Sequence, residues 1–322
     1  MFDSLVMPTF DGVRAAAERI APYGVSNTPL YRWPGLDRVV GTEVWVKHEN
    51  HQPVGAFKVR GGVNLISQLD EATKSAGVIA ASTGNHGQSI AFASKLFGVP
   101  AKICVPENAN AVKVGSMRDL GAEVIAHGRD FDDAREHSEE LADRYGYRYV
   151  HSGNEPLLIE GVGTITLEIL EERPDIDVVI VPIGGGSGAA GACVAGKAIK
   201  PGLRVIGVQA AAAPAAFRSW EAKSLLEDEM KTAAEGLATR TAFEMPQQIM
   251  WDQLDEFVLV SEDELSDAVV MMIEHTRNLV ELAGAASLAA ALKLRADLEG
   301  KKVALICSGG NITVDQLRMM LL

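Results

Sequence analysis

Cysteine, basic charge and long apolar runs are all scarce in this sequence, and each scarcity excludes a class of protein. Its three cysteines, Cys104, Cys193 and Cys307, are too far apart for a CxxC pair, and an odd number cannot complete a disulfide framework. With 30 basic and 43 acidic residues the formal net charge is -13, which disfavours nucleic-acid phosphates and anionic lipid heads as partners. No stretch approaches about 18 uninterrupted apolar residues, as a membrane helix would require. We therefore expect a cytoplasmic protein that binds neither nucleic acid nor membrane.

Two further signals are missing. Residues 1–20 contain five charged side chains and lack a basic segment followed by an apolar one, so we expect no signal peptide. The seven histidines show neither HxxxH nor HExxH spacing, and we therefore expect no metal ion.

What the sequence does contain is an alternation of short apolar runs with amphipathic stretches. The predicted strands are 43–47, 78–81, 102–105, 123–126, 148–150, 178–182, 204–208, 257–260 and 303–307. The predicted helices are 88–97, 112–120, 131–145, 159–172, 187–199, 264–282 and 285–298, and Ser261 with Glu264 reads as a capping box. This order predicts an α/β protein with open, mostly parallel sheets and helices on both faces.

The first motif is His51–Gly61 (HQPVGAFKVRG), in which Lys58 lies between Phe57 and Val59. A lysine packed among apolar groups has a lowered pKa and can attack a carbonyl to form a Schiff base. The alternative from this segment alone is a surface lysine at an ordinary helix start.

The second motif is Ala81–Gln88 (ASTGNHGQ), which follows a predicted strand and opens a helix. The main-chain N–H groups, with Ser82, Thr83 and Asn85, can bind a carboxylate or another anion. The alternative is an N-cap that needs no ligand.

The third motif is the glycine-rich Val181–Gly191 (VPIGGGSGAAG), where Gly184, Gly185, Gly186, Ser187 and Gly188 can surround a phosphate. The segment also satisfies the dinucleotide fingerprint GxGxxG. That fingerprint expects an acidic residue after the next strand, whereas this strand is followed by Gln209 and Ala210.

The fourth motif, Cys307–Asn311 (CSGGN), ends the last strong strand. Ligands of parallel α/β sheets lie at the carboxyl ends of strands. A Schiff-base lysine, an anion loop, a phosphate loop and a polar strand end together indicate pyridoxal 5'-phosphate as the cofactor.

These four motifs, in this order, resemble the fold type II pyridoxal-phosphate enzymes, and among them the serine/threonine dehydratase and serine racemase family. The resemblance implies a two-domain fold like that of the tryptophan synthase β chain. Its large cofactor-binding domain would comprise residues 1–72 and 152–322, and its small domain residues 73–151. The sequence departs from the family pattern at Ala56, Val162 and Gln209, and the last of these stands where many members have a glutamate that helps to bind a divalent cation.

The resemblance also implies the role of each site residue. Lys58 would carry the cofactor and act as the base at Cα, Phe57 would pack on the ring, and Asn85 and Ser308 would contact the ring hydroxyl and nitrogen. Gly184–Gly188, including Ser187, would hold the phosphate. The substrate side would be formed by Ser82, Thr83, Asn85, His86 and Thr239, with Glu281 nearby.

From these roles we expect an ammonia-lyase that converts L-threonine or L-serine, its small-molecule partner, to a 2-keto acid and ammonia. The alternatives are serine racemase, a dehydratase of a bulkier β-hydroxy amino acid and, from another class, a nucleotide-binding oxidoreductase. Racemisation requires an acid or base opposite Lys58, and the resemblance places Thr83 there, where family racemases have serine. Family members commonly form a homodimer or a higher homo-oligomer, and we expect the same here.

Overall fold

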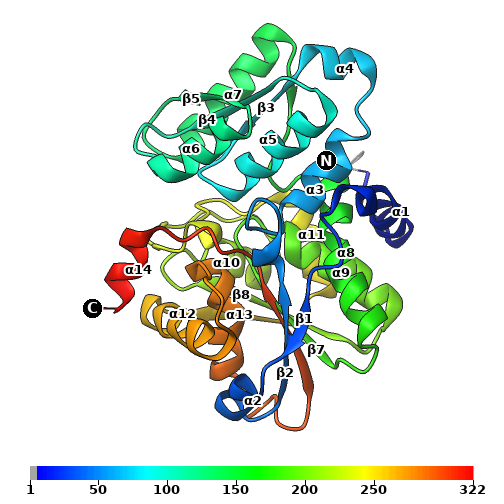
Figure 1. The fold of residues 1–322 in the computed structure, drawn as a ribbon, viewed down its shortest axis with the longest axis vertical. Helices are drawn as coiled ribbons and strands as arrows, with labels where there is room; N and C mark the ends of the chain where they lie inside the picture. The colour runs from blue at the N-terminus through cyan, green and yellow to red at the C-terminus, as the bar shows by residue number, and fades with distance from the viewer. Residues whose placement is uncertain (1–5, 322) are drawn as a thin grey trace.

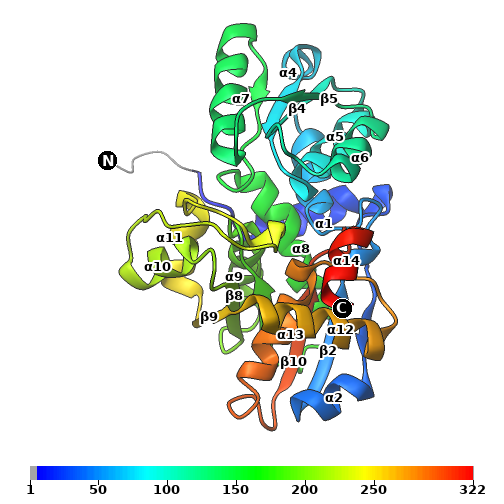
Figure 2. The same cartoon turned by 90° about the vertical axis from the view of Figure 1, so that its left-hand side faces the viewer.

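The structure, a computed structural model, describes residues 6–321 of the chain. Part of the segment for which no signal peptide is expected, residues 1–5, lies outside the described residues. Two separate β-sheets lie one above the other, each covered by helices (Figures 1 and 2). Within the described part of the chain, no helix has the length and apolar character needed to span a membrane.

The larger sheet has six strands in the order β1-β2-β10-β7-β8-β9, and only β1 runs antiparallel to its neighbour. Its strands are β1 Leu30–Arg32, β2 Glu43–His48, β7 Val178–Pro182, β8 Arg204–Ala210, β9 Glu256–Val260 and β10 Lys302–Cys307. The smaller sheet is parallel throughout, in the order β5-β4-β3-β6. It contains β3 Val78–Ala81, β4 Ala101–Val105, β5 Glu123–Ala126 and β6 Arg148–Tyr149.

The helices before β6 are α1 Phe10–Ile20, α2 Pro34–Val40, α3 Val59–Ile66, α4 Glu71–Ala76, α5 Asn85–Phe97, α6 Ala111–Asp119 and α7 Phe131–Tyr145. Those after it are α8 Pro156–Glu172, α9 Ser187–Ile199, α10 Ala215–Ala222, α11 Glu244–Gln253, α12 Glu262–Thr276, α13 Leu282–Lys293 and α14 Val314–Leu321. The described residues also form three short 3-10 turns, η1 Ala21–Tyr23, η2 Glu49–His51 and η3 Glu235–Leu237.

Alternate residues of the central strands pack on opposite faces, so the middle of each sheet is buried on both sides. In β7, Val178 and Ile180 pack with α13, whereas Val179 and Val181 pack with α8 and α9. In the smaller sheet, Ile79 faces α7 and its neighbours face α5. This double burial explains why the strands read as continuous apolar runs in the sequence, and it confirms the predicted α/β class.

Every predicted strand is present to within a residue or two, but four helix predictions were wrong by three residues or more at an end. Helices α5 and α8 each begin three residues before their predicted starts at 88 and 159. The helix predicted over 264–282 is α12, which ends at Thr276 because Arg277 adopts a left-handed conformation with φ 62°. The helix predicted over 285–298 is α13, which starts at Leu282 and ends at Lys293. The capping box is confirmed, since Ser261 and Glu264 each bond the other's backbone N–H.

Candidate active site

A cavity of about 340 Å³ lies where the carboxyl ends of β3, β7 and β10 meet the loops that follow them. All four motifs contribute to its wall. The residues predicted from the sequence that line it are Phe57, Lys58, Ser82, Thr83, Asn85, His86, Gly184, Gly185, Gly186, Ser187, Gly188, Thr239, Glu281 and Ser308. The structure therefore brings every predicted site residue into one place.

Lys58 reaches the cavity from the residue before α3. Its Nζ donates to the carbonyl oxygen of Ser152 at 3.0 Å and to Ser187 Oγ at 2.8 Å. Nζ also lies 5.4 Å from the centre of the Phe57 ring. Burial lowers the pKa of the Lys58 amine from 10.5 to about 8, because the charged form is poorly solvated.

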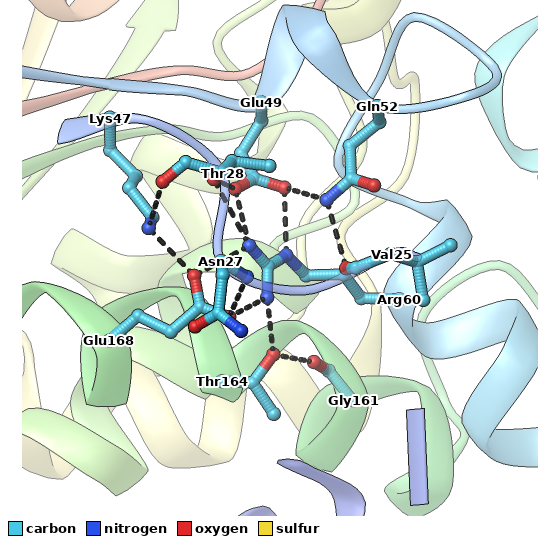
Figure 3. A network of polar contacts seen from close by, with 10 residues as sticks. All are labelled: Val25, Asn27, Thr28, Lys47, Glu49, Gln52, Arg60, Gly161, Thr164 and Glu168. Carbon is cyan, nitrogen blue, oxygen red and sulfur yellow. Dashed lines mark hydrogen bonds and ion pairs between the residues drawn. The ribbon is translucent and has the colours of Figure 1, made fainter. Parts of the chain in front are cut away.

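Buried charges hold the chain just beyond Lys58 (Figure 3). The Arg60 guanidinium, fully buried, bonds both carboxylate oxygens of Glu49 at 2.8 Å and bonds Glu168 on α8 at 2.5 and 2.9 Å. Lys47 on β2 lies 2.6 Å from Glu168. Burial alone would raise the pKa of Glu168, but hydrogen bonds and charge from Arg60 and Lys47 lower it. Two cations and two carboxylates thus join β2, η2, α3 and α8.

The glycine-rich loop leads into α9. Its N-cap residue is Gly186, with φ 88°, which has no side chain to accept the first N–H groups of the helix. A Cβ at Gly184 would lie 2.3 Å from the carbonyl oxygen of Gly236, and one at Gly185 would lie 2.3 Å from the Phe243 ring. The loop therefore needs glycine for close packing, and the first N–H groups of α9, which no side chain caps, suit a phosphate.

A second helix, α5, also begins at the cavity with glycine, Gly84, at its N-cap. Ser82 Oγ accepts from the N–H groups of Gly84 at 3.0 Å and Gly87 at 2.8 Å. The alternative of an N-cap made by Ser, Thr and Asn side chains is therefore wrong, because the N-cap is Gly84 and has no side-chain cap bond. Ser82 instead bonds the first turn of α5 from two residues before the N-cap. Its hydroxyl hydrogen stays free to donate, however, so these bonds do not prevent Ser82 from binding an anion.

Asn85 belongs to a chain of polar contacts that crosses the cavity wall. Its Nδ2 donates to Glu281 Oε1 at 2.6 Å, and its Oδ1 accepts from Asn311 Nδ2 at 2.8 Å. Burial raises the pKa of Glu281, while nearby Lys113 and the Asn85 bond oppose the rise. Lys113, on α6, pairs with Glu235 on η3 at 2.5 Å.

Sequence reasoning missed Lys113, Glu235 and Ser152. Lys113 lies in a segment with no motif. Glu235 begins the segment EGLAT, which supplied Thr239 as a predicted site residue but gave Glu235 no role. Ser152 contributes a main-chain oxygen, which no side-chain pattern can indicate. Asn311 was inside the CSGGN motif but received no role, although its amide pairing with Asn85 gives it one.

The remaining predicted residues are placed as follows. Burial, followed by the Lys58 charge, lowers the pKa of His86 to about 3, so its imidazole is neutral. Ser308 Oγ donates to the carbonyl oxygen of Ala283 at 3.2 Å, and Thr239 Oγ1 donates to that of Gly184 at 3.4 Å. Gln209 Oε1 is bonded to the Phe217 N–H at 3.0 Å. The expectation that no metal ion binds stays a prediction.

The class of protein follows from a family comparison. The family model described as pyridoxal-phosphate dependent enzyme matches residues 21–309, and the chain belongs to this family. Its cofactor is pyridoxal phosphate, as the four motifs predicted, and the nucleotide-binding oxidoreductase alternative is excluded.

Individual relatives within this family are named as ammonia-lyases and racemases. The chain is 39% identical to the L-threonine ammonia-lyase of Thermotoga maritima, over 97% of this chain and 77% of the relative. It is 34% identical to the serine racemase of Schizosaccharomyces pombe, over 98% of each. Its structure is similar to that of maize serine racemase, with a TM-score of 0.92, 34% identity and coverage of 98% of this chain and 97% of the other.

The residues in the cavity fit this cofactor. Lys58 is within 2.8 Å of the first residue of α9, so a group attached to Lys58 and carrying a phosphate can reach the free N–H groups of that helix. Phe57 supplies an aromatic face, and Ser308 supplies a neutral hydroxyl at the end of β10.

Proposed function

We propose that this protein is an ammonia-lyase that converts L-threonine or L-serine to a 2-keto acid and ammonia. The observation that carries the proposal is the position of Lys58 Nζ beside the start of α9, in the same cavity as the start of α5. One cavity then offers a nucleophilic amine, a phosphate site and a carboxylate site. The relatives named L-threonine ammonia-lyase support this reading.

The chemistry that pyridoxal phosphate supplies when bound is electron withdrawal from Cα of the amino acid. The chain's own residues supply the rest. The N–H groups of α5, with Ser82 and Thr83, bind the substrate carboxylate, and Asn85 and Ser308 orient the ring. The amine of Lys58 takes the proton from Cα, a role for which its lowered pKa is suited.

Charge pairing favours an uncharged substrate side chain. Apart from Lys58, the lysine and arginine side chains that line the cavity in the described part of the chain already have partners: Lys113 bonds Glu235, and Arg129 bonds Asp133 at 2.9 Å. A substrate with a second carboxylate would therefore have to compete with Glu235 and Asp133 for these two cations. This favours threonine or serine over an acidic analogue such as hydroxyaspartate, the substrate in the name of a yeast relative that is 36% identical.

The test is chemical trapping at Lys58. We expect borohydride to fix the cofactor on the peptide that contains Lys58, and we expect Lys58→Ala and Lys58→Arg to lose turnover, because neither provides an amine. The assay measures keto acid formed from L-threonine and L-serine. A cofactor label on any other lysine would overturn the site.

Serine racemase remains the second candidate, because the Schizosaccharomyces pombe and maize relatives carry that name. A bulkier β-hydroxy amino acid remains a third, since the cavity volume alone does not fix the side chain.

We further propose that the domains divide at residues 72 and 151, since the smaller sheet comprises strands between Val78 and Tyr149. We also propose that the protein forms a homodimer or a higher homo-oligomer and lies in the cytoplasm. The three cysteines of the chain are all unpaired and buried, which suits a reducing compartment.

A further inference from the structure

The Lys58 amine has two hydrogen-bond acceptors, and they come from different parts of the chain. One is the carbonyl oxygen of Ser152, in the loop between β6 and α8, at 3.0 Å. The other is Oγ of Ser187, the first residue of α9, at 2.8 Å. A carbonyl oxygen can only accept, so the amine must donate one N–H to Ser152.

Two acceptors match the neutral form of an amine. A neutral amine has two N–H bonds and one lone pair, whereas an ammonium ion has three N–H bonds. If Ser152 takes one N–H and Ser187 the other, only the lone pair remains unengaged. Among residues 6–321 no third acceptor bonds Lys58 Nζ, so a protonated amine would leave one N–H without a protein partner.

Ser187 lies in closely packed surroundings. Its side chain is buried, and the preceding Gly186 has φ 88° and lies close to Pro246 and Met250. Ser187 Oγ accepts from Lys58, which leaves its own hydrogen free to donate to an anion at the start of α9.

We propose that Ser187 is a positioning residue for Lys58: together with the Ser152 carbonyl it holds the amine by its two N–H groups, so that the lone pair is presented for reaction. The inference deepens the proposed function, since it takes Lys58 as the residue that carries the cofactor. It assigns Ser187 a task beyond binding phosphate.

A phosphate-free aldehyde separates the two tasks. Attachment joins the amine nitrogen to the aldehyde carbon and releases one water molecule, for pyridoxal phosphate and for pyridoxal alike. A residue that only binds phosphate affects the first reaction and not the second. A residue that positions the amine affects both.

The experiment uses the full chain freed of cofactor and follows attachment by its visible absorption band, with borohydride trapping to identify the lysine. We expect Ser187→Ala and Ser187→Gly to slow attachment of both pyridoxal phosphate and pyridoxal about tenfold, the effect of losing one hydrogen bond. Ser219→Ala is the matched control, because Ser219 is a buried serine of α10 that bonds the Ala215 carbonyl, and it should react as the wild type does. Circular dichroism checks that each variant folds. Ser187→Gly is included because the segment already contains three glycines before Ser187, so the backbone tolerates glycine there.

Two results would overturn the inference: attachment slowed for pyridoxal phosphate alone, or attachment unchanged for both. The proposed function fails separately, if borohydride labels a lysine other than Lys58 in the wild type. Labelling of Lys58 with unaltered pyridoxal kinetics in the variants would remove only the role of Ser187.

Discussion

At the residue scale, we expect the hydroxyl of Thr83 to distinguish the two reactions considered for this cavity. Thr83 lines the cavity between Ser82 and Gly84, at the start of α5. Reprotonation of Cα from the side opposite Lys58 needs an acid there, whereas loss of the β-hydroxyl does not. The methyl group of threonine restricts χ1, so we expect reprotonation of Cα through this hydroxyl to be slower than loss of the β-hydroxyl.

We therefore expect Thr83→Ala to keep keto-acid formation from L-serine within about tenfold of the wild type. Any D-serine formation should fall by about a hundredfold, the effect of removing a general acid. Pyruvate and D-serine are measured together in one assay. D-serine appearing faster than pyruvate in the wild type would reverse the ranking of the two activities.

At the scale of the elements, the sequence predicted strands better than helices, for a physical reason. A strand buried on both faces must be apolar throughout, so β3 and β7 were predicted with correct ends. Helix α3 (VRGGVNLI) contains two glycines and an asparagine, which favour no helix, and all eight of its residues are buried. Tertiary packing therefore stabilises this helix, and the local sequence does not predict it.

Glycine contacts determine how closely the helices beside the site approach. A Cβ on Gly191 of α9 would lie 2.8 Å from the main-chain nitrogen of Gly163 on α8 and 2.9 Å from the Ile159 carbonyl oxygen. We expect Gly191→Ala to lower the free energy of unfolding by about 1–3 kcal/mol through this overpacking. Gly202→Ala is the control, because no atom lies within 4 Å of its added methyl. Urea unfolding measures both, and equal stabilities of the two variants would contradict the close contact.

The Arg60 network joins elements in a different way, through buried charge (Figure 3). Arg60→Leu would leave the carboxylates of Glu49 and Glu168 without their main partner, because Arg60 bonds both. We expect a loss of about 3–5 kcal/mol in the free energy of unfolding. Arg295→Leu, at an exposed arginine, should change it by less than about 0.5 kcal/mol. If Arg60→Leu also changed the free energy of unfolding by less than about 0.5 kcal/mol, water would be replacing the guanidinium without loss of stability.

At the scale of the whole molecule, the motifs predicted the walls of the site but not what joins them across the cavity. Each motif follows or precedes a strand, and strand ends converge in parallel sheets, so Lys58, the glycine-rich loop and Ser308 could be placed together from sequence. Lys113 and Glu235 are 122 positions apart in the chain, and no motif gave either of them a role. Their pairing depends on how the smaller sheet lies against the larger one, which no local pattern encodes.

The Lys113–Glu235 ion pair therefore offers a test of what holds α6 at the cavity. Lys113 is buried on α6, beside the smaller sheet, and Glu235 belongs to η3, beside the larger one. Lys113→Met should loosen α6, so we expect faster hydrogen exchange in residues 111–119 and a KM raised about fivefold, corresponding to about 1 kcal/mol. Glu235→Gln should act in the same direction.

Lys102→Met is the control. Lys102 pairs with Glu123 within the smaller sheet, so this variant should leave KM unchanged. Unchanged exchange in residues 111–119 of the Lys113→Met variant would show that packing alone, and not this ion pair, holds α6 over the cavity.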